Sequence, residues 1–364
     1  MPPPIWPLPT TPILRMSSEL PPEGNQLLIG EIRRAIERAG GRIPFRDYME
    51  LALYHPEHGY YCAAGEKTGP PQADGDYLTS PQISPLFAEC LARFIGSGPV
   101  LELGAGDGSL ASQLAPRFDY TIVERSPDFR ARQQAKLSPR PPQRERARER
   151  VPSVRWVAEV PEGFVGTVIS NELLDALPVH RVVQGQERYV RADFTEELGP
   201  YSTPRLAAYF EALGLQPAGE AEVNLDALDL MAEVYERLAR GRVLTIDYGY
   251  DAETLYLSHP QGTFLTYFRH TADDKPYERI GLKDMTSHVD FTSLMRLGEA
   301  CGLRTLAFTT QADFLAEQGI GELLVAAQSA ATDAAGYVAA RQAAINLIDP
   351  AGLGGFRVLI QEKG

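Results

Sequence analysis

The sequence predicts an α/β fold in which helices cover both faces of a largely parallel β-sheet. Short apolar runs alternate with segments of helical spacing, which is typical of strands joined by crossover helices. A glycine-rich bend follows the first apolar run, in VLELGAGDGSLASQL at 100–114, where a strand passes into a helix. The expected strands lie at 100–103, 120–123, 154–157, 167–170 and 243–246, and a hairpin of 304–308 and 356–361 could complete the sheet.

Composition restricts the classes of partner. The 364 residues are 44% apolar, enough for a large core in about two domains, or one domain with insertions. The net charge of -13 argues against nucleic-acid binding, which needs clustered Lys and Arg, and favours a basic or zwitterionic partner. No apolar run is long enough for a membrane span. Three distant cysteines argue against a disulfide framework and for a reducing, cytoplasmic compartment. Composition does not indicate an oligomeric state.

The first part of the chain is expected to precede the sheet. Residues 1–25 are rich in proline and indicate a loose tail, and residues 26–98 indicate a helical cap. We expect helices at 29–39, 45–54 and 85–96, and a mobile loop at 64–76.

Residues 99–364 are expected to form the sheet domain, which two segments interrupt. The proline- and charge-rich stretch 138–150 indicates a solvated insertion, with a docking surface as the alternative. A helical insertion is expected at about 195–240, with helices near 206–213 and 225–238 that resemble a lid.

The glycines of the bend indicate a ligand site. Gly104, Gly106 and Gly108 let the backbone turn sharply and approach a ligand, and the next helix presents free N–H groups. Dinucleotides and S-adenosyl-L-methionine both use such bends. The dinucleotide pattern is matched poorly, because Ser109 stands at its third glycine or alanine position.

Acidic residues near the bend favour S-adenosyl-L-methionine. Glu102 would repel a pyrophosphate but suits an ammonium or sulfonium charge, and Asp107 indicates the same. Glu124 ends the next strand, where a carboxylate can accept hydrogen bonds from ribose hydroxyls. An ordinary turn with two surface acids is the alternative. The predicted cofactor residues are Glu102, Gly104, Ala105, Gly106, Asp107, Gly108 and Glu124.

A second polar cluster follows the strand in VISNELLDALPVHR, residues 168–181. Asn171, Glu172 and Asp175 come just after apolar residues, at the edge where open α/β sheets bind ligands. If a helix begins at Glu172, then Glu172 and Asp175 lie one turn apart and could converge on one cation. Alternatively, the cluster simply caps that helix.

Six blocks identify a family resemblance, in the order PFRDYMELALYHPEHGYY, GDYLTSPQISPLFAE, ELGAGDGSLA, SNELLDALPVHR, LTIDYGY and DMTSHVDFTSL. Together they resemble the MidA-like family, bacterial relatives of the mitochondrial complex I assembly methyltransferase, over about residues 27–310. The resemblance implies a seven-stranded class I methyltransferase that uses S-adenosyl-L-methionine, with protein arginine as acceptor. It also implies that Asp76, Thr79, Ser80 and Ser84 could close over the methionine end of the cofactor, and that Asn171 borders the cofactor.

Two departures from the family weaken the substrate inference but not the cofactor inference. Gln82 stands where family members usually carry an acid, and residues 67–73 lengthen the loop before it.

For an arginine acceptor, carboxylates would orient a guanidinium whose pKa is above about 12. Glu172 and Asp175 suit that role, and His288 is a candidate proton acceptor. Asp247 and Tyr248 could line the same mouth, although Tyr248 could equally be a core ring. Methyl transfer needs no metal, and the His55 and His58 pair lacks a third ligand. The alternatives are a small-molecule or peptide O- or N-methyltransferase, a non-catalytic assembly chaperone and a nicotinamide oxidoreductase.

Overall fold

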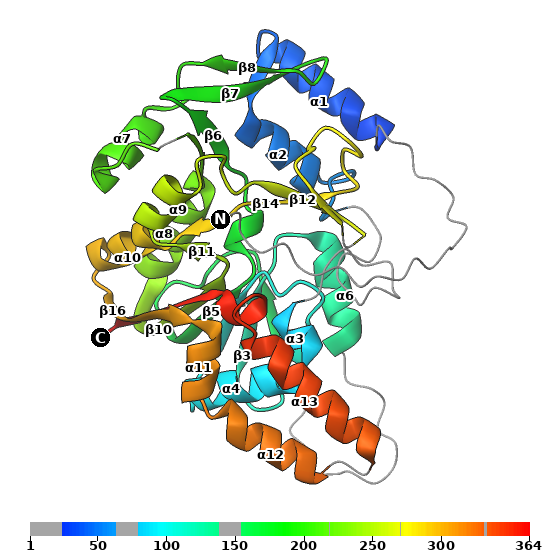
Figure 1. The fold of residues 1–364 in the computed structure, drawn as a ribbon, viewed down its shortest axis with the longest axis vertical. Helices are drawn as coiled ribbons and strands as arrows, with labels where there is room; N and C mark the ends of the chain where they lie inside the picture. The colour runs from blue at the N-terminus through cyan, green and yellow to red at the C-terminus, as the bar shows by residue number, and fades with distance from the viewer. Residues whose placement is uncertain (1–23, 63–78, 138–153, 218, 270, 331–332) are drawn as a thin grey trace.

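A seven-stranded mixed sheet forms the centre of the protein, shown in Figure 1 as a computed structural model that describes residues 24–62, 79–137, 154–217, 219–269, 271–330 and 333–364. The strand order is β16 (Arg304–Thr310), β17 (Arg357–Lys363), β10 (Leu238–Asp247), β5 (Phe164–Asn171), β2 (Val100–Leu103), β3 (Tyr120–Val123) and β4 (Val154–Val157). All neighbours are parallel except β17, which runs antiparallel to both β10 and β16. The predicted fold class is confirmed.

The last two strands pair as expected, but the chain between them is longer than a hairpin turn. Three helices, α11 (Gln311–Glu317), α12 (Ile320–Ala330) and α13 (Ala334–Ile348), lie between β16 and β17. They extend to the bottom of the view in Figure 1. Their alanine-rich sequence favours helix but gives little contrast between an apolar and a polar face, so periodicity does not mark them.

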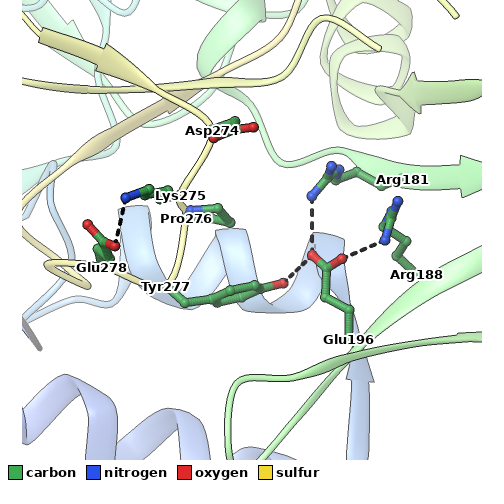
Figure 2. Close-up of a pocket in the computed structure, with 8 residues that line it drawn as sticks. All are labelled: Arg181, Arg188, Glu196, Asp274, Lys275, Pro276, Tyr277 and Glu278. Carbon is green, nitrogen blue, oxygen red and sulfur yellow. Dashed lines mark hydrogen bonds and ion pairs between the residues drawn. The ribbon is translucent and has the colours of Figure 1, made fainter. Parts of the chain in front are cut away.

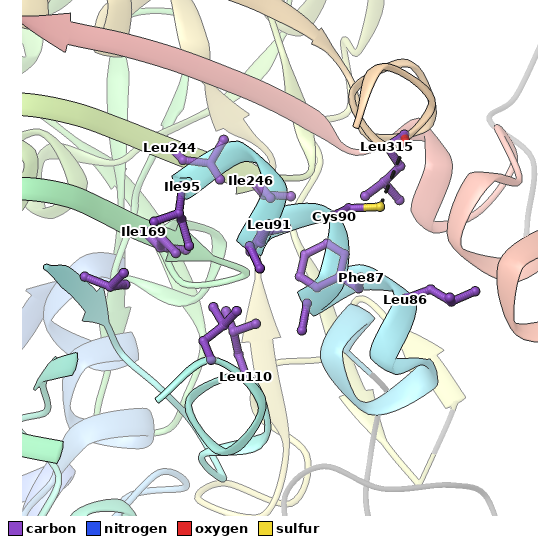
Figure 3. Packing of buried hydrophobic residues seen from close by; sticks show 14 of the residues in the cluster. Leu86, Phe87, Cys90, Leu91, Ile95, Leu110, Ile169, Leu244, Ile246 and Leu315 are labelled. Atoms are coloured by element: carbon purple, nitrogen blue, oxygen red, sulfur yellow. Dashed lines mark hydrogen bonds between the residues drawn. The ribbon is translucent and has the colours of Figure 1, made fainter. Parts of the chain in front are cut away.

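Helices cover both faces of the central sheet because its strands alternate between two apolar surfaces. On one face, Ile169 and Leu244 pack against Phe87 and Leu91 of α4 (Pro85–Ile95), as Figure 3 shows. The other face lies under α8 (Leu225–Arg237) and α10 (Phe291–Ala300). Capping agrees with the sequence at α4: Ser84 Oγ accepts a hydrogen bond from Leu86 N at 3.2 Å, and Gly96 has a φ of 69°.

A second, antiparallel sheet lies at the top of Figure 1. Its order is β1 (Arg42–Pro44), β7 (Gln186–Arg191), β6 (His180–Val183) and β9 (Glu220–Val223), with β8 (Glu196–Gly199) also paired to β7. Helices α1 (Gln26–Arg38), α2 (Phe45–Tyr54) and α7 (Pro204–Leu213) accompany it. The inserted segment therefore carries strands as well as the expected helices, and β1 joins it to the N-terminal cap.

The remaining elements connect these layers: α3 (Ser80–Ile83), α5 (Ser109–Leu114), α6 (Pro127–Leu137), η1 (Leu174–Ala176), β11 (Gly249–Tyr250), α9 (Ala252–Ser258), β12 (Leu265–Phe268), β13 (Thr271–Asp273), β14 (Asp284–Thr286), β15 (Val289–Asp290) and η2 (Leu353–Gly355). None of the helices in the described part of the chain is long and apolar enough to cross a bilayer. The expected loops at 64–76 and 138–150, and nearly all of the expected tail at 1–25, lie outside the described residues.

Candidate functional site

A glycine loop, residues 104–108, joins β2 to α5 at the carboxyl end of the sheet. Gly104, Gly106 and Gly108 have φ values of 60°, 51° and 78°, a left-handed backbone conformation that residues other than glycine adopt at an energetic cost. Gly104 N donates a hydrogen bond to Val123 O at 3.0 Å, which ties the loop to β3, and Ala105 is buried. A Cβ atom built on Gly106 would meet no atom of the described residues within 4 Å, so among these residues this side of the loop leaves room for a ligand.

The two acids beside the glycine loop have opposite environments. Glu102 is 4% exposed, and burial raises its pKa to about 8. Asp107 is also partly buried, but hydrogen bonds from Lys136 and Ser109 outweigh that burial and lower its pKa. Its carboxylate accepts from Ser109 N at 2.9 Å and Lys136 Nζ at 2.9 Å, so it fixes the start of α5. Glu102 is therefore the acid with the greater capacity to respond to a ligand charge.

Glu124 directly follows β3 and is tied to the glycine loop through a buried glutamine. Its Oε1 accepts from Ser126 N at 2.9 Å, and its Oε2 accepts from Gln133 Nε2 at 2.9 Å. The same nitrogen of Gln133 donates to Gly106 O at 2.9 Å. Burial raises the pKa of Glu124. Gln133 was not among the predicted site residues, because it lies in a polar helix where no pattern distinguishes it.

A cavity of about 420 Å³ opens beside Glu124. Its lining residues are Glu124, Arg125, Pro127, Arg130, Ala158 and Glu159. This volume lies within the range of small-molecule sites, about 300–1,000 Å³. The lining of this cavity includes no residue of the glycine loop, and the two are connected through Glu124 and the hydrogen bonds of Gln133.

The acid turn, residues 171–175, follows β5 and is not helical at its start. Glu172 has a φ of 50°, and its N–H donates to Ile246 O at 2.9 Å. The expected helix from Glu172 is wrong, because this left-handed residue is tied to β10 and only the single turn η1 follows. Glu172 and Asp175 therefore do not share a helical face, and Asn171 is the last residue of β5.

Each carboxylate of the acid turn is held by the surrounding chain. Glu172 Oε1 accepts from Ser80 N at 3.1 Å and Asn171 Nδ2 at 3.0 Å, and burial raises the pKa of Glu172 to about 7. Asp175 Oδ2 accepts from the hydroxyls of Tyr248 and Thr286. Burial also raises the pKa of Asp175.

Three buried polar atoms near this edge have no hydrogen-bond partner among the described residues. They are Asn171 Oδ1, Asp175 Oδ1 and His288 Nδ1. Buried polar atoms are normally satisfied, so such a group indicates a ligand surface. The His288 ring lies 5.6 Å from the Tyr248 ring, and burial lowers its pKa to about 4, so it is neutral at physiological pH.

Asp247 does not line the mouth as expected. Its side chain is fully buried, and both carboxylate oxygens accept hydrogen bonds from backbone N–H groups. Tyr248 does reach the acid turn through its hydroxyl group, and Asp290 is the N-cap of α10. Among the described residues, no cluster of His, Cys, Asp and Glu is arranged to hold a metal ion, and the His55 and His58 rings stack on each other.

The block before α4 joins the acid turn to the glycine loop. Ser80 is buried and donates its N–H to Glu172, while Thr79 begins α3. Gln82 Nε2 donates to Asp107 Oδ2 at 3.2 Å, a contact that an ionised acid at position 82 could not make. Asp76 and the loop at 67–73 lie outside the described residues.

Figure 2 shows another cavity, of about 410 Å³, on the second sheet. Its lining includes neither the glycine loop nor the acid turn. Glu196 accepts from Arg188 Nη1 at 2.6 Å, from Tyr277 at 2.7 Å and from Arg181 at 3.3 Å. These charges neutralise one another, which distinguishes this cavity from the site at the sheet edge.

Comparison with known proteins supports a methyltransferase. Residues 91–309 match a family model for S-adenosyl-L-methionine-dependent methyltransferases. The mitochondrial protein arginine methyltransferase NDUFAF7 of Danio rerio is 28% identical over 326 residues, which cover 78% of this chain and 74% of that protein. The human protein of the same name is 26% identical over 337 residues, covering 78% and 71%. These relatives are mitochondrial, which contradicts the expected cytoplasmic location.

A solved structure agrees with the sequence comparison. A candidate methyl transferase from Burkholderia thailandensis, with bound S-adenosyl-homocysteine, is 32% identical to this chain. It superimposes with a TM-score of 0.84 over 95% of each chain.

Proposed function

Because this chain belongs to the family of S-adenosyl-L-methionine-dependent methyltransferases, we propose that it methylates an arginine side chain of a partner protein. The curated relatives named above are protein arginine methyltransferases, and their similarity covers most of both chains. The observation that carries the proposal is a pair of carboxylates, the buried Asp175 and the partly buried Glu172, beside acceptor atoms that lack partners among the described residues.

The residues at the glycine loop fit the cofactor, which supplies an electrophilic methyl group when bound. Gly106 leaves room for close backbone approach, and Glu124 can accept hydrogen bonds from ribose hydroxyls. Glu102 can become ionised opposite the positive charges of the methionine portion. These assignments rest on the open backbone, the adjoining cavity and the chemistry of the acids.

The acid turn suits a guanidinium group. An arginine side chain stays protonated and offers several N–H donors in a fixed plane, so it needs acceptors on more than one side. Asp175 Oδ1 and Asn171 Oδ1 are such acceptors, and Glu172 adds a second carboxylate. The attacking nitrogen bonds to the methyl carbon, the carbon–sulfur bond breaks to a neutral thioether, and the nitrogen loses a proton. Neutral His288, whose Nδ1 lacks a partner, can receive that proton.

The test uses tritiated S-adenosyl-L-methionine and protein from a lysate of cells that lack this chain. We expect label in protein, released as methylarginine by acid hydrolysis and identified by mass spectrometry. Glu172→Gln should strongly reduce the label without loss of S-adenosyl-homocysteine binding. Label recovered only in a small molecule, or in a residue other than arginine, would contradict the proposal.

A further inference from the structure

We propose that Asp247 is a positioning residue whose side chain sets the geometry of the acid turn by binding the backbone of that turn. Its Oδ2 atom accepts from Leu174 N at 2.9 Å, from Leu173 N at 3.2 Å and, more weakly, from Asp175 N at 3.4 Å. Three consecutive N–H groups thus point at one carboxylate oxygen and favour its ionised form, while burial and the nearby Asp175 carboxylate raise the pKa of Asp247. The inference rests on the proposed function, because it concerns how the two proposed substrate-binding acids are held.

The acid turn needs such an acceptor because it leaves β5 in a conformation that no sheet or helix continues. Glu172 has a left-handed backbone conformation, which is unfavourable for residues other than glycine. The N–H groups that follow it would be buried without partners if Asp247 did not accept from them. Since Ile246 O accepts from Glu172 N, the end of β10 binds the acid turn at consecutive residues.

Asp247 acts through other residues because its own carboxylate is fully used. Its Oδ1 atom accepts from Tyr248 N at 3.0 Å, and the side chain has no exposed surface. Tyr248 in turn donates its hydroxyl hydrogen bond to Asp175 Oδ2. Two consecutive residues at the end of β10 therefore hold the acid turn. Asp247 binds the backbone N–H groups of the turn, and Tyr248 binds the Asp175 side chain.

The test compares Asp247→Asn, which keeps the shape but not both acceptors, with Asp247→Glu, which keeps the charge but moves it. For both variants we expect the rate of label transfer into lysate protein, at saturating S-adenosyl-L-methionine, to fall at least tenfold. The KM for the donor and the Kd for S-adenosyl-homocysteine should change less than threefold. Hydrogen exchange at the amides of 173–175 should accelerate at least tenfold in the variants.

Asp251→Ala is the matched control. Asp251 caps α9 by accepting from Thr254 N at 2.9 Å, and no hydrogen bond joins it to the acid turn. This variant should lower Tm but leave kcat unchanged. The inference would be overturned if Asp247→Asn kept the wild-type kcat and the wild-type exchange rates at 173–175. It would also be overturned if Asp251→Ala, at the same Tm as Asp247→Asn, lost as much kcat as that variant does. If the wild-type protein transfers no label to arginine, the proposed function fails, while the exchange rates still decide whether Asp247 holds the turn.

Discussion

Tyr120 donates a hydrogen bond from its hydroxyl group to Glu102 Oε2 at 2.9 Å, across the neighbouring strands β3 and β2. Burial raises the pKa of Glu102 to about 8, although the Tyr120 hydrogen bond opposes the shift. Without a ligand, this acid therefore keeps its proton at pH 7. A positive group of the cofactor would favour the ionised form, so binding should be linked to proton release.

The first prediction is that S-adenosyl-L-methionine binding releases a proton from Glu102 near neutral pH. The affinity should rise between pH 6 and pH 8, by up to about tenfold per pH unit, because the proton leaves more readily as pH increases. Calorimetry in buffers with different ionisation enthalpies measures the release. Glu102→Gln should remove it, whereas identical binding heats in all buffers for the wild-type protein would refute the link.

The second prediction concerns Glu124. Glu124→Gln should weaken S-adenosyl-homocysteine binding about 10- to 100-fold, because hydrogen bonds to a charged group contribute about 1.5–3 kcal/mol. The amide also loses an acceptor that Gln133 now uses. Calorimetry measures the affinity. Glu162→Gln is the control, since that acid is 81% exposed and, among the described residues, forms an ion pair with Arg237; an equal loss there would show a general charge effect.

The strands and the glycine loop of the candidate cofactor site could be predicted because their signals are local in the chain. The expected bounds of β2, β3 and β4 agree with the structure, in which Glu102 lies in β2 and Glu124 directly follows β3. The glycines stand within five residues of one another. Each of these features depends on neighbours in sequence, which periodicity and spacing record.

The acceptor half depends on contacts between distant segments, which one sequence does not reveal. Asp175 meets Tyr248 and Thr286 across 73 and 111 residues. The left-handed conformation of Glu172 could not be predicted, because the residues of the acid turn are also compatible with the start of a helix. In the second sheet, short strands such as β6 carry charged residues that pair across the sheet, Arg181 with Glu220 for example, and so resemble solvated loops.

The third prediction separates two glycines of the glycine loop. Gly104→Ala should destabilise the protein by about 1–2 kcal/mol from its left-handed backbone, and further because the new Cβ would lie 2.6 Å from Leu173 Cδ1. Gly106→Ala should show only the backbone cost but lower S-adenosyl-homocysteine affinity at least about tenfold, since its Cβ points into open space. Denaturant unfolding and calorimetry measure the two effects.

Gly96→Ala provides the control for Gly106→Ala. Gly96 has a φ of 69° and likewise has nothing within 4 Å of a built Cβ, but it ends α4 rather than the glycine loop. It should show a similar loss of stability with unchanged affinity. Unchanged affinity in Gly106→Ala as well would remove this residue from the cofactor site.

The fourth prediction is a pH dependence with opposite signs for activity and stability. Burial raises the pKa of Glu172 to about 7, so the acid is neutral below that pH and binds a guanidinium poorly. kcat/KM for the arginine acceptor should therefore rise as pH rises through about 7.

The same raised pKa stabilises the folded state at low pH, and that contribution, on the order of 3 kcal/mol, is lost as pH rises from about 4.5 through about 7. The titration of Glu172 itself thus cannot produce the acidic fall in activity through a loss of folding. Glu172→Gln should be weakly active and lack this limb, whereas Glu222→Gln, which alters a buried acid of the second sheet whose pKa is also raised, should retain it. An acidic limb that survives in Glu172→Gln would assign the titration to another group.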